Sequence, residues 1–373
     1  MSDARKTLPG WLSGGPLLCA AFPETPAVQK LRGAGGSDGA QIYAAAFSDA
    51  ALEGLVGAGI KVVWLRFFSG LGLEFEKAEI ERVSAYVAKA RTAGLKAALS
   101  VQLGSLAPET LLLEEGDAAN WLAVNQDGQN VVPQAPEFYR QRPCYNAEGF
   151  MRYMERVCGL ASDCGTDLVH FDGIVHNPEP DTCRCPICVA AFRDFVRQQY
   201  GSQDEHTRQA GLARFGFNTF THLRPPMVLR AAGGVSPNPA SESPHIQEWI
   251  RFKAHTLAQC VMRLGHGLRK RNPECAIGAD LFRYLNAGVE LGWRHGIDYA
   301  LQLPALDVVT VQVPHACSVS RLKAETPAVL SEQLTVARAF GVVTQVPAQR
   351  APLSVADSGV FERQQYELFE LTA

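Results

Sequence analysis

The sequence lacks a long uncharged apolar run. A membrane-spanning helix needs about 20 predominantly apolar residues, and the best candidate, residues 50–68, is interrupted by Glu53, Lys61 and Arg66. Net charge is also small, because 35 Lys and Arg residues against 38 Asp and Glu residues give a formal charge of −3. Such a surface offers no strong field for a polyphosphate. We therefore expect no membrane span and no nucleic-acid partner.

Cysteine is too sparse for a disulfide scaffold, since ten cysteines are spread over 373 residues. Only Cys183, Cys185 and Cys188 are clustered. Near the N-terminus, basic residues precede the apolar run 17–22, as they do in a signal peptide, but prolines and glycines interrupt the segment. We expect a mature cytoplasmic sequence, with secretion as the weaker alternative.

Short apolar runs rich in β-branched or aromatic residues alternate with amphipathic segments, as buried parallel strands alternate with helices. The clearest runs are 62–67, 95–101, 168–172, 276–282, 308–313 and 342–346. Helical spacing of apolar residues predicts helices at 75–93, 149–161, 189–200, 246–270 and 329–340. Two weaker runs, 17–22 and 42–47, bring the candidate strands to eight.

Eight candidate strands favour an α/β fold of the (β/α)8 TIM-barrel type, as a single catalytic domain over residues 1–373. An open doubly wound sheet is the alternative, but no G-x-G-x-x-G loop follows the first strand, so nucleotide binding is disfavoured. Segment 201–244 interrupts the alternation after the fourth main strand, and its Pro- and Ser-rich end predicts a loop insertion. Because loops after the strands form the active-site face of a barrel, this insertion should shape a cleft.

Three thiols lie close together in Cys183-Arg-Cys-Pro-Ile-Cys188. Cysteines at C-x-x-C spacing can bind one tetrahedral Zn²⁺, and Cys183 can reach the same ion from the preceding turn. Cys144 is the best candidate for a fourth ligand. The alternatives are Cys158, Cys164 and His176. A loop of free thiols without an ion is the simpler interpretation, but we favour zinc, and four thiolates would make it structural.

Two predicted strands end in a carboxylate, Asp172 and Asp280. Aspartate is a poor strand former and costly to bury, so at the C-terminal end of a strand it should face a polar cleft. Paired carboxylates are the minimum apparatus for glycoside cleavage, which predicts Asp172 as nucleophile or base and Asp280 as general acid. Either aspartate could instead cap the next element or pair with an arginine such as Arg66 or Arg283.

Other polar and aromatic side chains also fall at or just beyond strand ends, where they could bind sugar hydroxyls. The candidate substrate-binding residues are Arg66, Gln102, His170, His176, Phe282, Arg283, Tyr284, Gln312 and His315. Any one of them alone could be a satisfied scaffold group, and Trp64, in mid-strand, is more typical of core. Their joint placement favours an oligosaccharide or glycoside as the substrate.

The segment from Cys183 to Gly201 is similar to the zinc-cluster loop and following helix of glycoside hydrolase family 42 β-galactosidases, with C-x-C-x-x-C and then an aromatic-rich helix ending in Tyr-Gly. Cys144 resembles their upstream zinc ligand. A wider likeness, over roughly residues 50–201, is to hypothetical glycosyl hydrolase family 6, which has a Trp…Asp-Gly segment, here Trp121 to Gly128, before a Cys-x-Asn turn. These resemblances imply a carbohydrate-active (β/α)8 scaffold with a zinc site.

The sequence also departs from the β-galactosidase pattern, which has an Asn-Glu pair at the end of the fourth strand. That place holds Asp172-Gly173 here, and the seventh-strand candidate offers Gln312 or Gln345 in place of a nucleophilic glutamate. We therefore predict a glycoside hydrolase with paired aspartates. A carbohydrate-binding barrel without activity and a zinc-dependent hydrolase of another bond are the alternatives, and a homo-oligomer stays open.

Overall fold

The computed structural model describes residues 8–33, 39–133, 138–201, 204–227, 243–280, 292–310, 335–347 and 366–372. Their strands form one closed barrel in the order β1 to β8. The strands are β1 (Leu17–Ala21), β2 (Val62–Phe68), β3 (Lys96–Gln102), β4 (Leu168–Asp172), β5 (Ala276–Ala279), β6 (Val308–Thr310), β7 (Val343–Pro347) and β8 (Glu367–Thr372). β1 to β7 pair in parallel, whereas β8 runs antiparallel to both β7 and β1. The predicted barrel fold is confirmed.

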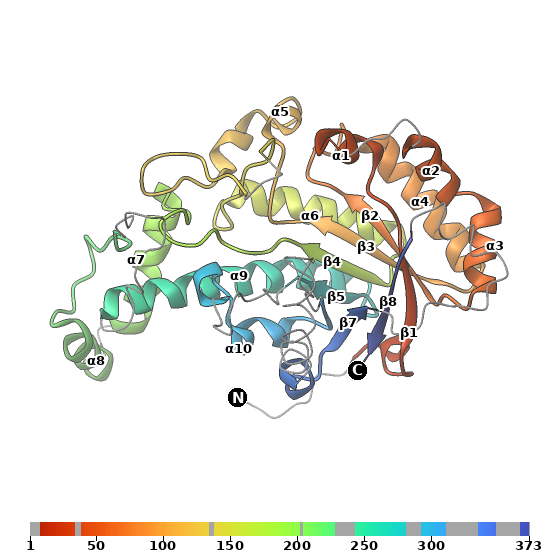
Figure 1. Ribbon diagram of the computed structural model, residues 1–373. Helices are drawn as coiled ribbons and strands as arrows, with labels where there is room; N and C mark the ends of the chain where they lie inside the picture. Colours follow the sequence, from red (N-terminus) through yellow and green to blue (C-terminus); the bar gives the residue numbers. More distant parts are fainter. Residues whose placement is uncertain are drawn as a thin grey trace, which may run out of the picture.

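Helices surround this barrel, with α2, α3 and α4 on one side of the molecule and α7 and α8 on the opposite side (Figure 1). The α-helices are α1 (Pro26–Leu31), α2 (Gly39–Ala46), α3 (Asp49–Gly57), α4 (Lys77–Thr92), α5 (Pro108–Leu111), α6 (Glu148–Asp163), α7 (Pro186–Tyr200), α8 (Glu205–Phe215), α9 (Pro244–Arg271) and α10 (Tyr299–Gln302). Short 3₁₀ helices are η1 (Gly10–Leu12), η2 (Gly116–Trp121), η3 (Gly292–His295) and η4 (Leu303–Ala305). No helix in these described ranges is long and apolar enough to span a membrane.

One predicted strand is wrong. Residues 42–47 lie mostly in α2, where Tyr43 and Ala46 are buried three positions apart, as on one face of a helix. A short apolar run fits either a strand or a helix by periodicity, and the Ala-rich composition decides for the helix here. The eighth strand is instead β8. Its residues Glu367 and Glu370 interrupt the apolar pattern, so the sequence does not indicate a buried strand there.

The barrel interior changes from apolar to polar along the strands. At the N-terminal end, all eight strands contribute to one buried cluster, which also contains Leu12 of η1. Its strand residues are Cys19, Val62, Trp64, Ala98, Leu168, Ala276, Val308, Val343 and Leu371. Side chains along a strand alternate between faces, so the next positions on this face are polar: Ser100, His170 and Thr310. Beyond them lie Gln102, Asp172 and Asp280.

The segment after α7 is only partly a loop. It contains α8, and an aromatic cluster joins its Phe220 to Phe192 of α7 and to Trp249 and Phe252 of α9. Trp249 packs edge-to-face on Phe192 at a centroid distance of 5.1 Å. The segment is therefore anchored on the outside of the barrel by buried aromatic area. Residues 228–242 lie outside the described part.

Candidate active site

A cleft of about 450 Å³ opens at the C-terminal ends of the strands. Its described lining includes five of the predicted site residues. They are Arg66, Gln102, His170, Asp172 and Asp280. Their strands β2 to β5 are hydrogen-bonded neighbours, with Gln102 in register with Asp172 and His170 in register with Gly278. The parallel register therefore brings these side chains together at the edge where barrel enzymes place their chemistry.

Asp172 is held by two neighbours. Nη1 of Arg66 donates to Oδ2 at 2.5 Å, and His170 Nδ1 lies 2.9 Å from Oδ1. The side chain is 14% exposed, so the carboxylate still reaches the cleft. Burial alone would raise the pKa of Asp172, but the Arg66 charge and the His170 hydrogen bond outweigh it and hold the pKa below its usual range. Asp172 is therefore ionised at neutral pH.

His170 joins the two aspartates. While Nδ1 contacts Asp172, Nε2 lies 3.5 Å from Oδ1 of Asp280 and 2.9 Å from the Thr310 hydroxyl. One oxygen of each carboxylate and a ring nitrogen lie within 4.8 Å of one another. The His170 side chain is only 3% exposed, whereas that of Asp280 is 24% exposed. His170 thus lies beneath the carboxylates and contacts them, rather than standing in open solvent.

Glycine makes room for this ring. On the neighbouring strand, a Cβ atom added to Gly278 would lie 2.7 Å from Cδ2 of His170. At the strand ends, a Cβ atom on Gly104 would lie 1.7 Å from the carbonyl oxygen of Gly173. Gly173 itself has φ of +70°, a conformation that other residues adopt rarely. These glycines fix the close approach of β3, β4 and β5 at the cleft.

The remaining predicted substrate-binding residues lie elsewhere or outside the described part. His176 is buried, with its ring 5.3 Å from that of Tyr145, and is not among the described cleft-lining residues. Burial and the Lys253 charge lower the pKa of His176 to about 3, so it is neutral. Phe282, Arg283, Tyr284, Gln312 and His315 lie outside the described residues, as does the side chain of Gln345.

Several lining residues were missed in the sequence. Ser100 accepts a hydrogen bond from Trp64 Nε1 at 2.7 Å, and Thr310 contacts His170. Arg140 and Arg142 also line the cleft, where they donate to the carbonyl oxygens of Ser69 and of Gly104. A signal existed for Ser100, a lone hydroxyl inside the apolar strand 96–102. The two arginines come from an irregular segment, and no pattern in the sequence points to them.

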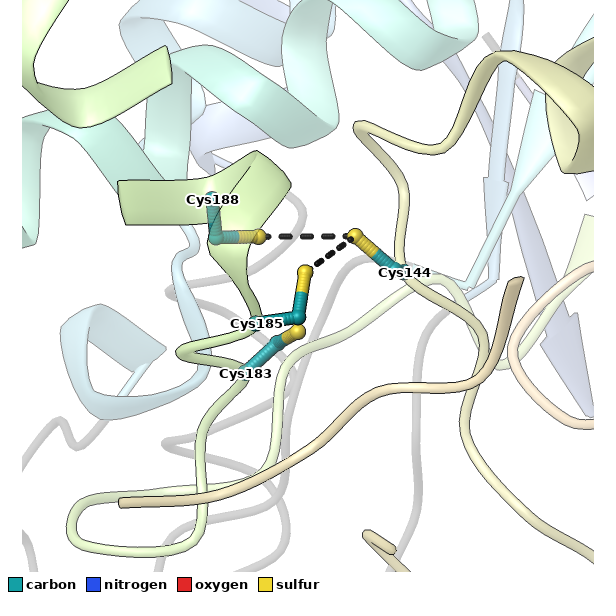
Figure 2. Close-up of side chains that lie close together, drawn as sticks. All are labelled: Cys144, Cys183, Cys185 and Cys188. Atoms are coloured by element: carbon teal, nitrogen blue, oxygen red, sulfur yellow. Dashed lines mark hydrogen bonds between the residues drawn. The ribbon is translucent and has the colours of Figure 1, made fainter. Parts of the chain in front are cut away.

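Four buried cysteines converge in a second cluster of polar groups. Figure 2 shows Cys144, Cys183, Cys185 and Cys188 with their sulfur atoms directed toward one another. Cys144 Sγ lies 3.5 Å from that of Cys185 and 3.4 Å from that of Cys188, and one sulfur of each cysteine lies within 4.8 Å of the other three. Hydrogen bonds among the four thiols lower the pKa of Cys185 and Cys183 and raise the pKa of Cys144 and Cys188, so the four groups titrate together. This set can hold a metal ion.

The structure places Cys144, the first choice for a fourth ligand, in this cluster. Cys188 lies in the first turn of α7, and Cys144 precedes α6. Cys158 is buried near Cys260 and Cys275 instead, and Cys164 contacts the Ser84 hydroxyl at 2.9 Å. Asn146 Nδ2 also donates to Cys188 Sγ at 3.3 Å, a contact that orients one sulfur.

A family model for β-galactosidases of glycoside hydrolase family 42 matches residues 51–350. The chain belongs to this family. A relative, the β-galactosidase Pbg of Clostridium perfringens, is 25% identical to this chain over 136 residues. These residues make up 36% of this chain and 18% of that protein. The match therefore spans less than a fifth of that relative's length.

Solved structures share the fold at low identity. The β-galactosidase from Bacillus circulans sp. alkalophilus superposes with a TM-score of 0.53 at 16% identity, over 75% of this chain and 40% of that one. The Halorubrum lacusprofundi β-galactosidase gives 0.54 at 17%, over 85% and 44%. The catalytic domain of a Paenibacillus polymyxa β-amylase gives 0.52 at 14%, over 93% and 89%. These likenesses show the barrel fold of the family 42 chain.

Proposed function

We propose that this family 42 protein is a glycoside hydrolase that cleaves an O-glycosidic bond in the cleft, with Asp172 and Asp280 as its paired carboxylates. The observation that carries the proposal is their placement. Both line one cleft, and their nearest carboxylate oxygens lie within 4.8 Å of each other. Family membership supports glycoside hydrolysis, whereas the choice of aspartates rests on this geometry alone.

The separation favours a retaining mechanism. Carboxyl groups about 5 to 5.5 Å apart leave no room for an attacking water between the base carboxylate and the sugar, whereas inverting enzymes need about 6.5 to 9.5 Å. Asp172, ionised beside Arg66, suits the nucleophile, because a carboxylate attacks only in its charged form. Asp280, whose side chain is more exposed than that of Asp172, suits the proton donor.

The reaction then has two steps. In the first, an Asp172 oxygen bonds to the anomeric carbon, the glycosidic C–O bond breaks, and the leaving oxygen takes the proton of Asp280. In the second, water gives a proton back to Asp280 and bonds to the anomeric carbon, and the bond to Asp172 breaks. Arg66 remains within reach of Asp172 and stabilises the released carboxylate.

Hydrolysis of an aryl glycoside panel tests the proposal, starting with aryl β-galactosides because the relatives are β-galactosidases. We expect Asp172→Asn to lose activity on all substrates. Asp280→Asn should lose far more on alkyl than on dinitrophenyl glycosides, since a good leaving group needs little protonation. Asp163→Asn, a surface change on α6, is the control. If Asp280→Asn lost the same factor in activity on every substrate, whatever its leaving group, the role of Asp280 as proton donor would be contradicted.

A 2-deoxy-2-fluoro glycoside tests the retaining mechanism directly. It should accumulate a glycosyl-enzyme ester, and peptide mass spectrometry should find the adduct on the peptide that contains Asp172. An adduct on another carboxylate would refute Asp172 as nucleophile while leaving the protein a glycosidase.

A non-catalytic carbohydrate-binding barrel is the second candidate. It is favoured by the tight pairing of Asp172 with Arg66 and His170, and by Asp172-Gly173 in the place where the family carries Asn-Glu. This candidate would be supported if the wild type hydrolysed no substrate in the panel, calorimetry showed that it binds a sugar, and Asp172→Asn weakened that binding.

Zinc fits the cysteine cluster. Two thiolates about 2.3 Å from a tetrahedral ion lie about 3.8 Å apart, close to the 3.4 and 3.5 Å measured from Cys144. Four thiolates leave no open position for a substrate, so the ion would be structural, which argues against a zinc-dependent hydrolase of another bond. Zinc content should fall in Cys183→Ser and stay unchanged in the control Cys260→Ser. Zinc-free wild type purified with zinc present would refute the site.

The likeness to hypothetical glycosyl hydrolase family 6, a cytoplasmic location and a homo-oligomer stay predictions from the sequence.

A further inference from the structure

We propose that His170 and Asp280 share one proton, so that the proton donor of the cleft is this pair rather than an isolated aspartate. The inference rests on the proposed function and deepens it. It assigns to His170, predicted from sequence as substrate-binding, the role of a positioning residue that acts through Asp280.

The geometry gives His170 one partner at each ring nitrogen. Nδ1 lies 2.9 Å from Asp172, which is ionised, so Nδ1 carries a hydrogen and donates it. Nε2 faces Asp280 Oδ1 at 3.5 Å and the Thr310 hydroxyl at 2.9 Å. The ring is fixed from the side by Trp64, whose centroid lies 5.0 Å away in an edge-to-face contact. Nε2 is therefore the only ring position whose protonation can change.

The charges decide how many protons the site holds. The charged and titratable groups that face His170 from the described strands are Arg66 of β2, Asp172 of β4 and Asp280 after β5. Arg66 and Asp172 neutralise each other. Counted over these four described groups, a single proton on either Nε2 or Asp280 brings the sum of the charges to zero, whereas none or two would leave a net charge beside His170, which is 3% exposed. Because burying net charge is costly, the one-proton state is favoured.

Proton sharing changes the pH at which the proton donor loses its proton. An ordinary aspartate has a pKa of about 3.9 and has lost its proton at neutral pH. In the pair, the last proton leaves only when neutral imidazole and an ionised Asp280 are both present, a step that belongs to the pair. Burial lowers the pKa of His170, but the Asp172 hydrogen bond and the two aspartate charges outweigh it, so the net effect is a raised pKa. The pair therefore keeps its last proton to a higher pH than an isolated aspartate would.

The proton balance follows. When the glycosidic bond breaks, Asp280 gives its proton to the leaving oxygen. If the proton resides on Nε2 beforehand, it first crosses to Asp280 Oδ1, and the electron pair of the N–H bond stays on Nε2. His170 ends neutral with Nδ1–H still donating to Asp172, and Asp280 ends ionised, ready to take a proton from water in the second step.

The pH dependence of kcat tests the inference with two non-titrating variants. His170→Asn retains a donor on the Asp172 side, and His170→Gln reaches toward Asp280. We expect both to move the alkaline limb of kcat to lower pH by about one unit or more, even where one of them rescues the rate at the optimum. Thr256→Val, which removes a buried hydroxyl of α9 that is not among the described cleft-lining residues, is the control, with the limb in place. An unmoved limb in both His170 variants would overturn the inference.

A measurement without turnover separates this inference from the proposed function. Long-range ¹H–¹⁵N spectra report the protonation of each of the 9 histidines, and the His170→Asn spectrum assigns the signal. We expect the pKa of His170 to fall by about one unit or more in Asp280→Asn, because a negative charge beside Nε2 is removed. An unchanged His170 titration refutes proton sharing. An inactive wild type with the expected titration refutes only the glycosidase.

Discussion

Replacement of Arg66 by glutamine isolates the charge that keeps Asp172 ionised. Arg66 Nη1 lies 2.5 Å from Asp172 Oδ2, and the two side chains are 41% and 14% exposed. An opposite charge at this range lowers a carboxyl pKa by about 1 to 3 units. In Arg66→Gln the pKa of Asp172 should rise by that amount, so the nucleophile is protonated at a higher pH and the acidic limb of kcat/KM moves upward.

The same change should cost little stability. Because Arg66 is more than a third exposed, solvent screens the pair, so we expect the pKa shift at the low end of that range, about one unit. A shift of one unit corresponds to a loss of about 1.4 kcal/mol in the free energy of unfolding. Asp172 has a lowered pKa in the folded state, so its contribution is present at neutral pH and is lost as pH falls through that pKa. The variant should therefore differ from wild type most at neutral pH and converge with it in acid.

The assay is a full pH profile of kcat/KM on one aryl glycoside, with denaturant unfolding on the same preparations. Arg152→Gln, on the exposed surface of α6, is the control for loss of one positive charge. An acidic limb that stays in place while activity falls would mean that Arg66 binds substrate rather than tuning Asp172. A large stability loss would mean that the pair is structural.

Three further outcomes follow from packing, burial and the thiol cluster. Gly278→Ala places a methyl group against His170, so kcat should fall and the free energy of unfolding should decrease by about 1 to 3 kcal/mol. Gly267→Ala, where the added methyl group has no neighbour within 4 Å, should not lower the free energy of unfolding. Burial raises the pKa of Glu76 to about 7. The free energy of unfolding of the wild type should therefore fall by up to about 3 kcal/mol as pH rises from about 4.5 to 7. Denaturant titrations at several pH values should show no such fall in Glu76→Gln. A strong chelator should lower the melting temperature of wild type but not of Cys183→Ser.

The barrel could be predicted because parallel buried strands leave continuous apolar runs. Residues 62–67 and 168–172, buried on both faces, are found as strands with nearly the same bounds. The exceptions are the segments where that rule has no force. Residues 42–47 are too short for period to separate helix from strand, and β8 pairs antiparallel and carries glutamates at 367 and 370.

The candidate site was predictable where it follows strand register. His170 and Asp172 are two positions apart on β4, and Gln102 ends β3 in register with Asp172, so their place near the strand ends brings them to a common edge. The sequence does not show how deeply a side chain is buried. It predicts His170 as a substrate-binding residue, whereas the absence of a side chain at Gly278 lets the His170 ring lie below the two carboxylates. Arg140 and Arg142 reach the cleft from an irregular segment, whose path depends on tertiary contacts rather than on local pattern.

The cysteine cluster ties together two points of the chain that are 41 residues apart, Cys144 and Cys185, and the stretch between them contains α6 and β4 with Asp172. An ion bound there would act as a removable cross-link around the strand that carries the proposed nucleophile. By the entropy of closing a loop of that length, such a link is worth about 4 kcal/mol. Metal supply during synthesis would then govern how readily this part of the barrel assembles, although an ion held by four thiolates would have no open position for a substrate.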